Sequence, residues 1–117
     1  MIANIIELLN SKGIVANQKY IANQGEELKS QVVITLDSIV SKNRLIATHS
    51  FNIQFYYLND NEVNNLFNIL MCDVVKLSKV GNPNLEVVKD SKQAPSNIQT
   101  ATYKYRIDVI AWAKTLK

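Results

Sequence analysis

Two residues in this sequence have side chains with strong intrinsic chemistry, the single histidine His49 and the single cysteine Cys72. An imidazole can act as a general base or a metal ligand, and a thiolate can act as a nucleophile. His49 lies between Ala47 and Phe51 on the apolar side of an alternating segment, and no nearby residue would orient it as a base. We therefore expect His49 to be a buried, hydrogen-bonded core residue without a catalytic role.

Cys72 stands alone, so an internal disulfide is excluded, and one cysteine with one histidine gives too few soft ligands for a zinc site within one chain. The sequence predicts no metal and no cofactor. Cys72 falls almost opposite the apolar stripe of its predicted helix, beside Asn65 and Lys76. Its thiol should be exposed to solvent or should contact another subunit.

Paired carboxylates, which general acid–base catalysis requires, are not evident in the sequence. Glu26 and Glu27 are adjacent and therefore diverge, and Asp37, Asp73 and Asp108 belong to different predicted elements. The three glycines are isolated, so no glycine-rich loop is available to hold a phosphate. We expect the protein not to be an enzyme.

Tyr103, Lys104, Tyr105 and Arg106 alternate aromatic rings with cations, a pattern that can serve single-stranded nucleic acid. On a strand, however, the two tyrosines share one face and the two cations share the other, so the tyrosines should join the core. The net charge of +3 arises from 13 basic and 10 acidic residues that are scattered along the chain. A nucleic-acid interface on this sheet face is therefore the secondary hypothesis.

The length of 117 residues and the 47% apolar fraction suit a single domain, 1–117, with one core. The N-terminal apolar stretch lacks a basic leader and is interrupted by Asn4 and Glu7. This pattern predicts neither a signal peptide nor a membrane span, and it favours an origin in the cytoplasm.

Hydrophobic periodicity predicts an α+β fold in the order α-β-β-β-α-β-β, with two helices on one face of a mostly antiparallel, twisted sheet. Helices are expected near 2–12 and 62–78, and strands over 14–16, 31–40, 45–58, 85–90 and 98–113. Asn59 or Asp60 with Glu62 should cap the second helix, and Gly81-Asn82-Pro83 should end it. The predicted core comprises Phe51, Ile53, Phe55, Leu66, Phe67, Leu70, Val74, Tyr105, Ile107 and Val109.

Two predicted strands are joined by a short polar turn at 41–44, in which Asn43 can take a left-handed conformation. The first, 31–40, is apolar on both sides, so it should be covered on both faces. The second, 45–58, would be about 46 Å long at about 3.3 Å per residue, so this hairpin should project beyond its own domain.

Ile110 and Trp112 place large apolar groups on the otherwise polar side of the last strand. They either anchor an interface, for which tryptophan is well suited, or pack locally against the first helix or the chain end. The two hairpin turns and the exposed thiol are further contact candidates. The candidate interface residues are Lys42, Asn43, Arg44, Cys72, Lys92, Gln93, Pro95, Ile110 and Trp112.

The layout of the chain resembles that of tail-terminator and tail-completion proteins of long-tailed bacteriophages. Three stretches carry the resemblance: the long strand from Asn43-Arg44-Leu45 to Tyr57-Leu58, the helix from Glu62 to Leu77 directly after it, and the ending from Tyr103 to Val109. The resemblance covers nearly the whole chain and is one of element order, without a specific motif.

This resemblance implies a structural virion protein of the tail or neck, assembled in the host cytoplasm. Its subunits would form a ring, usually a hexamer, that caps the tail tube and docks the head connector. The partners would be copies of itself, the tail tube protein and the connector, with DNA only passing through the lumen and no membrane. The alternative is a small regulatory module that binds protein or nucleic acid through its sheet face.

Overall fold

The computed structural model describes residues 1–22, 29–77, 81–93 and 98–110. Their elements, in chain order, are α1 (Ile2–Ser11), β1 (Ala16–Asn17), β2 (Gln31–Ser41), β3 (Ile46–Leu58), α2 (Asp60–Asn68), the π-helical segment η1 (Ile69–Asp73), α3 (Val74–Leu77), β4 (Gly81–Gln93) and β5 (Ile98–Ile110). The strands form one sheet in the order β1-β2-β3-β5-β4. Only the β1–β2 pairing is parallel. The predicted α+β class and the order of its main elements are confirmed.

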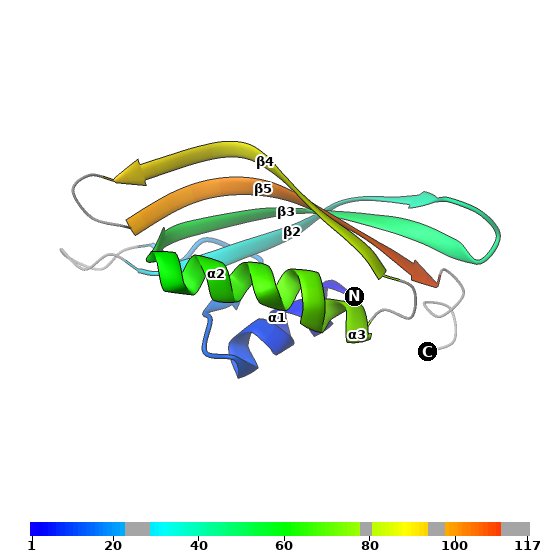
Figure 1. The fold of residues 1–117 in the computed structure, drawn as a ribbon, viewed down its shortest axis with the longest axis horizontal. Coiled ribbons are helices and arrows are strands. Elements are labelled where there is room, and N and C mark those ends of the chain that lie inside the picture. Colours follow the sequence, from blue (N-terminus) through cyan, green and yellow to red (C-terminus); the bar gives the residue numbers. More distant parts are fainter. Residues whose placement is uncertain (23–28, 78–80, 94–97, 111–117) are drawn as a thin grey trace.

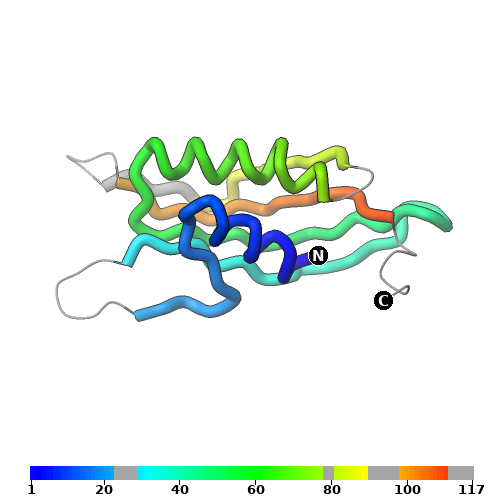
Figure 2. Tube along the Cα trace, turned by 90° about the horizontal axis from the view of Figure 1, so that it is seen from below, coloured from blue at the N-terminus to red at the C-terminus, as the bar shows by residue number. Residues whose placement is uncertain are grey.

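The helices cover one face of the sheet, as Figures 1 and 2 show, with α1 and the α2–η1–α3 rod side by side. Helix α1 buries Ile5 and Leu9 against the sheet. It ends near Gly13, whose φ of +87° is a conformation that glycine adopts without steric cost. The first predicted helix is therefore confirmed, ending one residue earlier than expected.

Helix α2 begins with the capping box that the sequence predicts. The Glu62 amide donates to Asn59 Oδ1 at 2.8 Å, and the Asn59 amide donates to Glu62 Oε1 at 3.0 Å. The rod continues through the π-helical turn η1 into α3, and the hydroxyl of Tyr105 donates to the Leu70 carbonyl in that turn. A strand of the sheet thus supplies a hydrogen bond to the part of the rod where the α-helical pattern changes.

The core lies between the helices and the inner face of the sheet. Phe51, Phe55 and Tyr105 are among its largest fully buried side chains. Phe67 is only half-buried, and its ring lies 5.0 Å from that of Tyr103 in an edge arrangement. All the other predicted core residues are buried: Phe51, Ile53, Phe55, Leu66, Leu70, Val74, Tyr105, Ile107 and Val109.

Strand β4 is longer than the sequence predicts, because Gly81-Asn82-Pro83, which were expected only to end the preceding helix, belong to this strand. These residues open β4, with Gly81 opposite Asp108 of β5. Gly81 and Asn82 have φ values of +103° and +54°, and the register shifts between Gly81 and Asn84. Because β4 is an edge strand, Pro83 can occupy it without breaking the pairing between β5 and β3.

The remaining strands follow the predictions with small changes of bounds. The first short strand is Ala16–Asn17 and not 14–16, and it pairs with Val32 and Val33 of β2. β2 and β3 match the predicted hairpin within one residue, whereas the last part of the predicted strand 98–113 lies outside the described residues.

Candidate functional site

The β2–β3 hairpin extends past the helical layer, at the right of Figure 1. We call its outer part, residues 35–48, the distal hairpin. It exposes four large apolar side chains: Leu36 is 46% exposed, Ile39 40%, Val40 59% and Leu45 60%. These exposures contradict the prediction that strand 31–40 is covered on both faces. The prediction fails because the helices lie on one face of the sheet only and do not reach this far along the hairpin.

Apolar groups occur on both faces of the distal hairpin. Leu36 lies opposite Phe51, and Ile39 lies opposite His49, so both belong to the face that the helices cover farther inward. Val40 lies opposite Thr48 and belongs to the other face. The register shift between Leu36 and Ser38 increases the local twist of this arm. A partner could therefore contact apolar surface from either side.

The turn at the hairpin tip is closed by Asn43, although not in the way the sequence predicts. Asn43 Oδ1 accepts hydrogen bonds from the amides of Leu45 at 2.9 Å and Ile46 at 3.0 Å. The positive-φ residues among those described do not include Asn43, so the expected left-handed conformation is wrong. The side chain satisfies the turn amides directly, so no φ reversal is needed.

Asp108 of β5 fixes the tip of the hairpin to the rest of the sheet. Its carboxylate accepts from Lys42 Nζ at 2.9 Å, from Thr48 Oγ1 at 2.7 Å and from Asn82 Nδ2 at 3.2 Å. Asp108 is buried, which by itself would raise the pKa of its carboxyl group. The three hydrogen bonds and the charge of Lys42 outweigh burial, so the pKa of Asp108 is lowered. The carboxylate is therefore ionised and joins the hairpin turn, β3, β4 and β5.

Two cations on the outer face of the sheet, opposite the helices, are already paired. Lys104 Nζ lies 3.1 Å from an oxygen of Asp37, and Arg106 lies 3.0 Å from an oxygen of Glu86. Tyr105 is fully buried and Tyr103 packs against the core, as the alternation predicts. Neither ring is available for base stacking on this face, which weakens the nucleic-acid hypothesis.

The predicted interface residues do not form one cluster. Lys42, Asn43 and Arg44 form the hairpin tip, and half-buried Ile110 lies nearby because it pairs with Ile46. Cys72 is exposed on η1, as expected.

The other predicted turn is largely part of a strand. Lys92 and Gln93 belong to β4 and pair with Gln99 and Ile98, which corrects the prediction of a loop starting at 91. In Figure 1 this end of the sheet is at the left, and the β2–β3 tip is at the far right of the molecule. The structure therefore brings together only part of the predicted set, and Pro95 and Trp112 lie outside the described residues.

Sequence reasoning missed the apolar side chains of the distal hairpin as contact residues. The sequence does contain a relevant pattern, because 31–40 has apolar residues on both of its sides. This pattern predicts burial within the subunit, whereas the structure leaves several of these apolar side chains exposed.

His49 is buried 6.2 Å from the ring of Phe51, in agreement with its prediction as a core residue. Within the described ranges, no group of three histidine, cysteine or acidic side chains is placed to hold a metal ion. None of the described helices has the length and apolar character needed to cross a membrane. Comparisons of the chain with protein-family models, curated proteins and solved structures gave no match.

Proposed function

We propose that this protein is a structural subunit that assembles with copies of itself through the distal hairpin. The observation that carries the proposal is the exposure of Leu36, Ile39, Val40 and Leu45 on an arm that extends past the helical layer. Exposed apolar groups gathered in one region are typical of protein interfaces. The Asp108 hydrogen bonds hold this arm in a fixed direction, which lowers the entropy cost of binding through it.

The sheet also has two edges that lack a neighbouring strand among the described residues. β1 covers only Val32 and Val33, so the outer part of β2 has no neighbouring strand on that side among the described residues. β4 forms the opposite edge and exposes Val87 and Val88. Open edges of this kind readily pair with another chain unless they are blocked.

Together with the resemblance in layout, these features support a more specific proposal. The protein would be a tail-terminator or tail-completion subunit in the neck of a long-tailed phage particle, assembled in the host cytoplasm. It would form a ring, in the simplest case a hexamer, that caps the tail tube and docks the head connector. Its role would be architectural, without catalysis, and DNA would only pass through the lumen.

Assembly can be tested by measuring mass in solution with light scattering and by imaging negatively stained particles. The wild-type protein should form closed multimers, and Val40→Asp should shift it towards monomer. Val15→Asp is the matched control, because Val15 is 50% exposed, comparable to the 59% of Val40, but lies outside the distal hairpin. A wild-type protein that stays monomeric at high concentration, or equal effects of both substitutions, would contradict assembly through the hairpin.

The phage assignment needs a separate test, because self-assembly alone is common to many structural proteins. Purified rings should bind the end of tail tubes and stop their elongation when both are mixed. Rings that leave tube length unchanged would contradict the terminator role while leaving the assembly proposal intact.

A further inference from the structure

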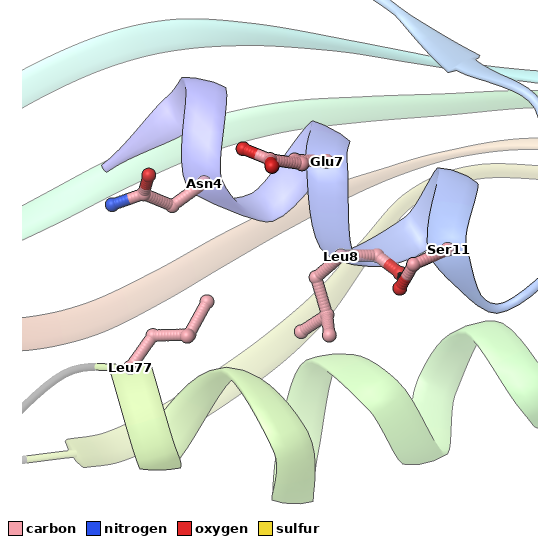
Figure 3. A pocket seen from close by; sticks show the side chains of 5 residues that line it. All are labelled: Asn4, Glu7, Leu8, Ser11 and Leu77. Carbon is pink, nitrogen blue, oxygen red and sulfur yellow. Dashed lines mark hydrogen bonds between the residues drawn. The ribbon is translucent and has the colours of Figure 1, made fainter.

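A groove of about 350 Å³ lies between α1 and α3, lined by Asn4, Glu7, Leu8, Ser11 and Leu77. Figure 3 shows the Leu8 and Leu77 side chains projecting from the two helices into the space between them. Leu77 is the last residue of α3, and its side chain is 44% exposed. The groove thus has an apolar floor and a polar rim that includes one carboxylate.

That carboxylate, Glu7, differs from all the other acidic side chains that the structure describes. It alone has neither an ion pair nor a hydrogen bond within the described part of the chain. The acidic side chains that do have such partners are Asp37, Asp60, Glu62, Asp73, Glu86 and Asp108.

The hairpin tip has the complementary character. Arg44 is exposed and has no ion pair with any described residue, and the neighbouring Leu45 is 60% exposed. Lys42 differs from Arg44 because it is committed to Asp108 within the same subunit. The tip therefore offers one apolar side chain and one free cation side by side, and the groove offers an apolar floor beside one free anion.

We propose that the hairpin tip of one copy of this chain docks in the α1–α3 groove of a second copy. Leu45 enters between Leu8 and Leu77, and Arg44 pairs with Glu7. The tip points away from its own helices in Figure 1, so a second molecule must supply the groove. This inference rests on the proposed self-assembly, which it deepens by naming both contacting surfaces.

Such a contact joins two different surfaces of the subunit. When each copy uses its tip on one neighbour and its groove on another, the contact produces a closed ring or, if the rotation does not close, a filament. When two copies insert their tips into each other's grooves, the same contact produces a two-fold dimer. The proposed contact therefore agrees with a ring, and the mass in solution distinguishes a ring from a reciprocal dimer.

The test is a charge exchange between the two surfaces, with the dissociation constant measured by sedimentation. Glu7→Arg and Arg44→Glu each place like charges together, so each should weaken association about tenfold or more. The double variant restores opposite charges and should return to within about threefold of the wild type. An equimolar mixture of the two single variants should also associate, because each variant supplies the surface that suits the other.

Lys19→Glu is the control, since Lys19 is also exposed and has no ion pair with a described residue, but lies outside both surfaces. It should leave association unchanged, and thermal melting should verify that every variant remains folded. If the wild type assembles but single variants behave like the control, or the double variant does not recover, this contact is wrong and self-assembly stands. If the wild type is monomeric, the proposed function fails together with the contact.

Discussion

Replacing Asp108 by alanine removes the acceptor that joins the hairpin turn to three strands. The lost hydrogen bonds from Thr48 and Asn82 are each worth about 1 kcal/mol net. The pair with Lys42 adds less than about 1 kcal/mol, because the Lys42 side chain is 54% exposed and solvent screens it. We therefore expect Asp108→Ala to lower the free energy of unfolding by about 2 kcal/mol at neutral pH, equivalent to about 10 °C in Tm for a domain of this size.

The same carboxylate should make stability depend on pH. The pKa of Asp108 is lower in the folded protein than its ordinary value, so its ionised form stabilises the fold. This contribution is complete above the ordinary carboxyl pKa of about 4 and is lost as the pH falls through the lower folded pKa. The stability difference between the wild type and Asp108→Ala should therefore shrink in acid.

Chemical denaturation followed by circular dichroism, at pH 7, 5 and 3, measures both effects. Asp37→Ala is the control, because Asp37 also forms an ion pair on the outer face but is 38% exposed, and it should cost less than about 1 kcal/mol. The stabilising role of the Asp108 carboxylate would be refuted if the two variants lost the same free energy of unfolding. It would also be refuted if the difference in this free energy between the wild type and Asp108→Ala stayed constant from pH 7 to pH 3.

Three further predictions concern the core, the helix cap and the thiol. Phe55→Ala should cost about 3–5 kcal/mol because Phe55 is fully buried, and an unchanged melting temperature would contradict the assigned core. Asn59→Ala should lower the free energy of unfolding by about 1 kcal/mol by removing the cap of α2, and an unchanged free energy of unfolding would contradict this. Cys72→Ser should change stability by less than about 0.5 kcal/mol, and the native thiol should react with a thiol reagent without denaturant. Loss of that reactivity on assembly would place Cys72 in a contact between subunits.

Features that depend on neighbouring residues could be predicted from the sequence. The Asn59–Glu62 capping box joins residues three positions apart, and its chemistry is visible in the sequence itself. The alternation that buries Tyr105 and turns Arg106 outward is also local, since it follows from the strand period.

Features that depend on distant strands could not be predicted. Asp108 contacts residues 26, 60 and 66 positions away, and nothing in the local sequence pairs it with Lys42. Gly81-Asn82-Pro83 has the composition of a helix stop, and only its pairing with β5 makes it part of a strand. Alternation likewise shows which side of β2 is apolar but not how far the helical layer reaches, so the exposure of Val40 was missed.

The position of β5 in the sheet has a consequence for the newly synthesised chain. β5 is the last described strand in sequence, yet it lies between β3 and β4 and pairs with both. Until the ribosome has released it, β3 keeps an open edge and Phe51 lacks its cross-strand neighbour Tyr105. Unpaired strand edges with exposed apolar groups promote aggregation, so the nascent chain should need the most protection by chaperones just before β5 emerges.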